Sequence, residues 1–268
     1  SLIKAMEILR LKYQFKGYLH VKFMPGIEFE QARYIMLYAD RVSLNLEAPS
    51  ADRISQLSPD KIAFEQLLDP LKWTQEIRQT PTNPSNWKGR WPSVCTQFVV
   101  GGSGESDHEL LQTTTFLYKS IHLQRAYYSP LKPYHGTPME NHPAIPLKRK
   151  LRLYQASFLI RDYGYDPEDL QFDQQANLPL EQDPKTAWAE KHLRESPIEI
   201  NRAEPETLMR IPGIGSKGAK KIIQMRSIHP FHDAADLTKL GIRIQKGLPF
   251  ITINGKRSMD QLSFHFLT

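Results

Sequence analysis

The chain has 268 residues, of which 40% are hydrophobic and 24% are charged, a composition typical of a globular protein with a substantial buried core. No run of 18 apolar residues is present, which excludes a membrane-spanning helix, and we expect no membrane partner. The net charge is +6, and the single cysteine, Cys95, excludes an internal disulfide framework and favours a reducing compartment such as the cytoplasm.

Helices and strands are predicted to alternate through the first half of the chain. Apolar residues at helical spacing predict a helix over residues 1–15, and because the pattern is already under way at Ser1 we expect this chain to be part of a longer protein. The strands are predicted at residues 17–25, 41–48, 96–101 and 124–129, and the helices at 28–39, 51–57, 61–71 and 105–120, with a loop at 80–93. This alternation favours an α/β fold with a parallel sheet or barrel.

The second half of the chain is predicted to be helical. Five prolines between residues 130 and 146 predict a stiff connection, a helix follows at 151–163, and Asp-Pro pairs at 166–167 and 183–184 predict two further helix starts. The predicted division is an α/β part at 1–130, a Pro-rich connection at 131–150, a helical linker at 151–195, an all-α domain at 196–257 and a tail at 258–268.

Polar residues alternate along the first two predicted strands. Period-2 alternation places His20 and Lys22 on one face of the first strand, and Asn45 and Glu47 on one face of the second. A parallel strand that is covered on both sides is nearly all apolar, so these residues predict a polar cavity near the carboxyl ends of the strands. The alternative is an open sheet whose polar face is solvated.

A glycine-rich turn follows the third predicted strand and contains Gly101, Gly102, Gly104 and Glu105. Glycines between a strand and a helix let a ligand contact the backbone amides directly. Many α/β loops contain glycine, so this turn indicates a ligand only in combination with the polar strands.

The segment 200–226 predicts two short helices joined by a tight turn. Its apolar residues lie at helical spacing on either side of a Pro-Gly-Ile-Gly sequence at 212–215, with Asn201 and Ser216 as the expected helix N-caps. Gly213 and Gly215 allow close approach of the backbone, and amides at a helix N-terminus suit an anion. The alternative is a tight turn that serves packing alone.

The positive charge is concentrated around this turn. Residues 191–268 hold 13 Lys and Arg against 7 Asp and Glu, whereas residues 1–190 hold 22 of each. Lys217, Lys220 and Lys221 follow the turn directly, so the segment is suited to phosphate capture without base reading. A solvated basic tail is the alternative explanation of the charge.

This segment resembles the helix-hairpin-helix motif of DNA-repair and competence proteins, through residues 211–215 followed by Ala219 and Ile222. The resemblance implies contacts with the DNA backbone from Pro212, Gly213, Ile214, Gly215, Ser216, Lys217, Lys220 and Lys221. A degenerate second hairpin is predicted at 233–250, with Asp233 as a cap, Gly241 in the turn and Arg243 in place of the second glycine. We expect it to support the first hairpin structurally.

The order of the segments resembles the DNA modification/repair radical SAM proteins. The matching stretches are GYLHVKFMPG at 17–26, RVSLNLEAPS at 41–50, TQFVVGGSGESD at 96–107, RAYYSP at 125–130, RLYQASFLIRDYG at 152–164 and INRAEPETLMRIPGIG at 200–215. The resemblance implies the later strands of a partial (β/α) barrel, followed by an all-α helix-hairpin-helix DNA-binding domain. It also implies S-adenosylmethionine and a 4Fe–4S cluster as cofactors. The implied cofactor-binding residues are Asn45, Glu47, Gly101, Gly102, Gly104 and Glu105, and the implied substrate-cavity residues are His20 and Lys22.

The chain departs from that family in its cysteines. The family holds its cluster with three cysteines in a Cys-x3-Cys-x2-Cys loop, whereas this chain has only Cys95. The resemblance places the cluster loop before Ser1, so we expect this chain to bind no metal and to be inactive alone. No catalytic residue and no DNA-repair partner protein is predicted. The alternatives are a non-catalytic DNA-binding or scaffold protein and a structure-specific RNA binder.

Overall fold

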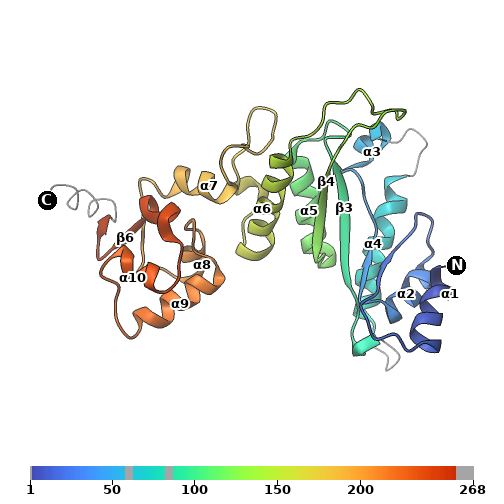
Figure 1. Cartoon of the computed structure of the whole chain (residues 1–268), viewed down its shortest axis with the longest axis horizontal. Helices are drawn as coiled ribbons and strands as arrows, with labels where there is room; N and C mark the ends of the chain where they lie inside the picture. The colour runs from blue at the N-terminus through green and yellow to red at the C-terminus, as the bar shows by residue number, and fades with distance from the viewer. Residues whose placement is uncertain (1, 58–62, 82–86, 258–268) are drawn as a thin grey trace. The chain divides into compact units, whose positions relative to one another are not determined.

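The computed structural model describes residues 2–57, 63–81 and 87–257 (Figure 1). The predicted tail at 258–268, the start of the predicted helix at 61–71 and the centre of the predicted loop at 80–93 lie outside the described residues. The chain forms two compact units: unit 1 comprises Ser1–Ser157 with Gln175–Asn177, and unit 2 comprises Phe158–Gln174 with Leu178–Thr268. The Pro-rich residues 131–146 belong to unit 1, and the chain first passes into unit 2 within one helix, α6 Leu147–Tyr163.

Unit 1 contains a parallel four-stranded sheet in the order β1-β2-β3-β4. Its strands are β1 His20–Lys22, β2 Arg41–Ser43, β3 Ser93–Val100 and β4 Arg125–Pro130, and β3 and β4 lie side by side in Figure 1. The parallel α/β arrangement expected from the alternation of elements is confirmed.

The first two strands are shorter than the predicted strands at 17–25 and 41–48. Ser43 pairs with Cys95, but the next bridge joins Glu47 to Phe98, so the second strand has one extra residue over this stretch, as in a β-bulge. The hydroxyl of Thr96 fills the gap, because its Oγ1 accepts from the Leu46 amide at 3.2 Å and donates to the Leu44 carbonyl at 2.8 Å. The ladder is therefore interrupted where the alternation pattern predicts an unbroken strand.

Helices alternate with these strands, as expected. They are α1 Leu2–Glu7, the π-helical turn η1 Ile8–Lys12, α2 Phe29–Tyr38, α3 Ala51–Leu57, α4 Phe64–Gln79, the 3-10 turn η2 Trp87–Gly89, α5 Asp107–Ile121 and α6. The prediction that a helix ends near Pro70 is wrong, because α4 continues to Gln79 and buries Leu71, Thr74 and Ile77 beyond the proline. The helix predicted from 151 begins earlier, at Leu147, directly after Pro146.

The core of unit 1 lies on one face of the sheet. The residues of this face are fully or almost fully buried: Val21, Phe23, Val42, Leu44, Val94, Phe98, Ala126 and Tyr128. Helices α2, α4 and α5 supply buried partners such as Ile35, Leu71 and Leu111. Alternate residues of the same strands project to the opposite face, which is polar.

Unit 2 is built of short helices and a small sheet. Its elements are the 3-10 turn η3 Pro167–Asp169, α7 Pro184–His192, β5 Ile198–Glu199, α8 Pro205–Met209, α9 Ser216–Arg226, α10 Ala234–Lys239, the 3-10 segment η4 Ile244–Phe250, β6 Ile251–Ile253 and β7 Lys256–Arg257. Strand β6 pairs in parallel with β5 and antiparallel with β7.

The expectation of an all-α domain at 196–257 is therefore wrong. Strands β6 and β7 are joined at Asn254-Gly255, where both residues have positive φ, at 53° and 77°. An Asn-Gly pair between short extended segments is a strong hairpin signal, and it was the missed indication of this sheet. None of the described helices is both long and apolar enough to cross a membrane.

Candidate nucleic-acid interface

The hairpin is formed by α8 and α9 and the turn that joins them. Gly213 has φ +88°, and a Cβ atom at this position would collide with the backbone carbonyl oxygen of Arg243. The turn is closed by the Ile214 amide, which donates to the Ile211 carbonyl at 3.1 Å. Gly213 is thus required both by its left-handed conformation and by close backbone packing.

Both predicted helix caps of the hairpin are wrong. Helix α8 is capped at Glu204 with Pro205 as its first residue, and α9 is capped at Gly215, which leaves Ser216 as the first helical residue. Asn201 instead accepts from the Phe231 amide and donates to the Phe231 carbonyl, both at 2.9 Å. Its side chain mimics a backbone strand and fixes the segment that leads into α10.

The N-terminus of α9 has the properties of an anion site. Gly215 provides no side chain to cap the helix, so the first-turn amides of α9 have no side-chain acceptor within the described part of the chain. The helix dipole adds partial positive charge at this end. The apolar residues that hold the turn and α9 in place are buried: Leu208, Ile211, Ile214, Ala219 and Ile222.

The three predicted DNA-binding lysines have different surroundings. Lys217 and Lys220 are exposed on α9. Lys221 is also exposed, but its Nζ donates to the Leu240 carbonyl at 2.8 Å, at the C-terminal end of α10. Lys217 and Lys220 are therefore the two cations of α9 best placed to contact a phosphate, while Lys221 joins the two hairpins.

The second hairpin packs beneath the first. Asp233 caps α10, as predicted, because its Oδ1 accepts from the Asp236 amide at 3.1 Å. Gly241 adopts φ +76° in the turn, and the following segment is the 3-10 element η4 rather than an α-helix. A Cβ atom at Gly247 would lie 2.5 Å from the Pro212 carbonyl oxygen, so the backbone of this segment packs directly against the hairpin turn.

Lys185 is a residue near the hairpin turn that the sequence did not indicate. Its Nζ donates to the Ile214 carbonyl at 2.6 Å and lies 4.9 Å from the centre of the Tyr163 ring. Burial of the amine lowers the pKa of Lys185 to about 8, and the nearby Asp183 carboxylate opposes that shift. Lys185 therefore supports the turn from the side of α7.

The polar residues predicted on the strands of unit 1 lie in pairs. Asn45 Nδ2 donates to Glu47 Oε1 at 3.0 Å, and both side chains are half-buried. His20 Nε2 lies 2.8 Å from Ser43 Oγ, and partial burial, followed by the charge of Arg41, lowers the pKa of His20. Glu47 has φ +63°, which is uncommon for a residue with a large side chain.

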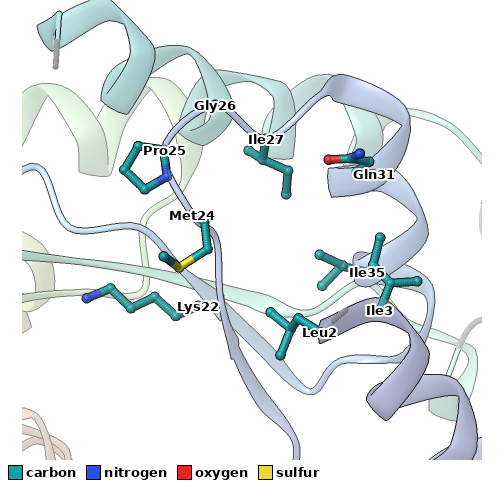
Figure 2. Close-up of a pocket in the computed structure, with 9 residues that line it drawn as sticks. All are labelled: Leu2, Ile3, Lys22, Met24, Pro25, Gly26, Ile27, Gln31 and Ile35. Atoms are coloured by element: carbon teal, nitrogen blue, oxygen red, sulfur yellow. The ribbon is translucent and has the colours of Figure 1, made fainter.

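Lys22 lines a pocket of about 280 Å³ that does not include His20. Figure 2 shows the lining residues, with aliphatic side chains from α1 and α2 on one side and the ammonium end of Lys22 on the other. The lining is mostly apolar: Leu2, Ile3, Met24, Pro25, Gly26, Ile27 and Ile35, with Gln31 and Lys22 as the polar members. This pocket is suited to an apolar group and not to a phosphate.

The glycine-rich turn is held by its own acid. The buried carboxylate of Glu105 accepts from the amides of Gly101 and Ser103, and from Ser103 Oγ at 3.0 Å. A Cβ atom at Gly101 would collide with Ile145, and one at Gly102 would lie 2.6 Å from Leu57 Cδ1. Gly104 has φ +64° and is exposed. Packing and turn geometry thus explain why glycine stands at these positions. The carboxylate of Glu105 already accepts hydrogen bonds from two of the loop amides.

Comparison with known proteins supports one part of this description. Residues 194–241 match the helix-hairpin-helix motif family, which covers α8, α9, α10 and the turns between them. No curated protein matches the chain. The hairpin is therefore assigned as a helix-hairpin-helix motif, and this motif suggests DNA binding.

Proposed function

We propose that unit 2 binds the sugar–phosphate backbone of DNA largely without sequence preference. The observation that carries this proposal is the start of α9, where uncapped first-turn amides lie beside the exposed Lys217 and Lys220. The match of residues 194–241 to the helix-hairpin-helix motif supports it.

The binding mode follows from the chemistry of the turn. A phosphate oxygen accepts from the first amides of α9, where the helix dipole also favours negative charge. Lys217 and Lys220 neutralise neighbouring phosphates and release their counterions. The side chains at the turn itself are glycine, proline and a buried isoleucine, which cannot read base edges, so affinity is independent of sequence.

The test is the double variant Lys217→Ala/Lys220→Ala in the full chain. We expect weaker binding to duplexes of unrelated sequence and a salt slope smaller by up to about two, because each lysine accounts for about one phosphate contact. The matched control is Lys191→Ala/Lys256→Ala, which removes the same charge from exposed positions outside the hairpin. Equal effects of the two double variants would remove the hairpin from the interface, and preference for a double-stranded RNA would favour the RNA-binding alternative.

We also propose a ligand-binding function for unit 1, and the conformation of Glu47 is the observation that supports it. Its left-handed backbone and its bond to Asn45 place two half-buried polar side chains just beyond the end of β2. Strained conformations of large residues often occur at ligand sites. By its resemblance to radical SAM proteins, we propose that this region binds S-adenosylmethionine and that the sheet belongs to a (β/α) barrel.

The chain does not fit the iron–sulfur cluster of that family. Cys95 is fully buried, burial raises the pKa of its thiol, and a single cysteine cannot provide three thiolates. Among the described residues, no group of three or more His, Cys, Asp and Glu side chains could hold a metal ion. No radical step is therefore assigned to this chain, and DNA modification or repair is proposed only for a protein that has those ligands.

Calorimetric titration with S-adenosylmethionine tests the ligand proposal. We expect binding by the wild-type chain and at least about tenfold weaker binding by Glu47→Gln, because a charge-assisted hydrogen bond contributes about 1.5–3 kcal/mol. Glu76→Gln, an exposed change on α4, is the control and should bind as the wild type does. A wild-type chain that does not bind this ligand would favour the non-catalytic DNA-binding protein.

A further inference from the structure

The polar face of the unit 1 sheet carries two arginines near the amino ends of the strands. The parallel register aligns His20 with Arg41 and Ser93, and Cys95 with Arg125, so these side chains project to the same face. Their sequence neighbours in the strands belong to the buried core on the opposite face. The arginines therefore lie on the side of the sheet away from the apolar core.

Aromatic rings alternate with these arginines. Arg41 Nη1 donates to the hydroxyl of Tyr127 at 3.3 Å, and its guanidinium carbon lies 5.8 Å from the centre of the Tyr18 ring. The guanidinium carbon of Arg125 lies 5.3 Å from the Tyr127 ring and 5.2 Å from the Tyr154 ring. We call the five residues Tyr18, Arg41, Tyr127, Arg125 and Tyr154 the Arg–Tyr band.

Arg41 has no carboxylate partner among the described residues. Its other side-chain hydrogen bond is from Nε to Ser93 Oγ, at 3.1 Å. Three other arginines of this unit are instead paired with acids, in the ion pairs Arg10–Asp40 at 2.8 Å, Arg53–Glu109 at 2.9 Å and Arg149–Asp107 at 2.7 Å. Because hydroxyls and rings hold this half-buried guanidinium and no acid neutralises it, its positive charge can attract an external anion.

The combination of arginines and tyrosines indicates the kind of ligand. Guanidinium groups bind phosphates in a planar, bidentate manner, and tyrosine rings stack on bases of any sequence. The unpaired bases of a single strand can stack on the tyrosine rings, whereas the bases of a duplex are stacked on each other and out of reach of the rings. We propose that the Arg–Tyr band binds single-stranded DNA, with phosphates at the arginines and bases on the tyrosines. This rests on the proposed function only in taking DNA as the partner, and not on the hairpin.

The test uses the full chain, a fluorescent twelve-residue oligothymidylate and a duplex of the same length. Arg41→Gln/Arg125→Gln should weaken single-strand binding by about tenfold or more and reduce its salt slope by about 1.4, with duplex binding unchanged. Lys217→Ala/Lys220→Ala should instead weaken duplex binding and leave single-strand binding unchanged. Tyr127→Phe, which keeps the ring, should bind the single strand more tightly than Tyr127→Ala.

Several results would overturn the inference. One is a tenfold loss of single-strand binding in the hairpin variant Lys217→Ala/Lys220→Ala with no loss in the arginine variant. Another is equally tight binding of thymidine monophosphate, which would indicate a nucleotide pocket rather than a strand site. If the arginine variant fails to fold, Tyr18→Ala decides, because Tyr18 is 56% exposed and its loss should weaken single-strand binding several-fold without lowering the melting temperature. Absence of duplex binding by the wild type would refute the hairpin proposal alone.

Discussion

Lys185 has a role that only the tertiary structure makes visible. In the sequence it follows an Asp-Pro helix start and resembles any surface lysine, but its Nζ lies 2.6 Å from a carbonyl oxygen 29 residues further along the chain. The carbonyl belongs to Ile214, in the turn for which we propose DNA binding. No periodicity or motif connects the two positions, so the contact could not be predicted.

The lowered pKa of Lys185 makes the stability of unit 2 depend on pH. Its folded pKa is about 8 against 10.5 in the unfolded chain, so between these values the unfolded state binds more protons and stability rises with pH. From pH 7.5 to pH 10 we expect the free energy of unfolding to rise by about 2 kcal/mol more in the wild type than in Lys185→Met. Urea titrations at both pH values measure this, with the exposed Lys191→Met as control. Parallel pH profiles of wild type and Lys185→Met would contradict it.

Two other polar residues of predicted turns have partners that the sequence did not indicate, and for Asn201 the predicted role is wrong. Asn201 was predicted to cap α8, yet its amide holds Phe231 before α10. Glu105 stays a predicted cofactor-site residue, and the structure adds that its buried carboxylate accepts from amides of its own turn. The sequence shows that a polar residue at a turn needs a partner, but several partners lie within reach and only the fold selects one.

At the scale of elements, local signals predicted the type and order of most segments. Alternating apolar residues located all four strands of unit 1, and the Pro-Gly-Ile-Gly sequence located the hairpin turn. The bulge between Ser43 and Glu47 was missed because it depends on the hydroxyl of Thr96, which belongs to another strand. In unit 1 the lengths of strands and helices therefore required the tertiary structure, whereas their existence did not; in unit 2 the small sheet of β5, β6 and β7 was not predicted at all.

The hairpin turn gives a prediction that compares two glycines of one motif. Gly213→Ala should destabilise unit 2 by about 2 kcal/mol or more and abolish duplex binding, because its φ is +88° and its Cβ would collide with the Arg243 carbonyl. Gly218→Ala, within α9, should instead stabilise by up to about 1 kcal/mol, because its Cβ would lie 3.5 Å from the nearest atom and alanine favours a helix. Thermal melts and duplex titrations of both variants provide the measurement. A Gly213→Ala protein that melts and binds like the wild type would show that the turn is not constrained in this way.

At the scale of the whole molecule, net charge is distributed unevenly along the chain. Residues 191–268 carry the whole net charge of +6, and they include the hairpin. Residues 1–190 have equal numbers of acids and bases, yet the Arg–Tyr band gathers positive charge locally on one face of the sheet. Net charge by segment therefore points to the site proposed at the hairpin but not to the one proposed at the Arg–Tyr band, because an average over many residues cannot show a local surface.

Each unit has its own core, so loss of one fold should leave the function of the other. Leu237 on α10 is completely buried, and Leu237→Asp would place an unpaired carboxylate beneath the hairpin. We expect a loss of about 4 kcal/mol or more, which is a large part of the stability of a small domain. Duplex binding should be lost, while oligothymidylate binding through unit 1 should remain within about twofold of wild type, since twofold corresponds to only about 0.4 kcal/mol.

The control is Ala235→Asp, on the exposed side of the same helix, which should change neither duplex binding nor oligothymidylate binding. Circular dichroism melts and the two binding titrations test this. Loss of both activities in Leu237→Asp, with a single collapse of the whole chain, would show that unit 1 depends on unit 2 for its fold.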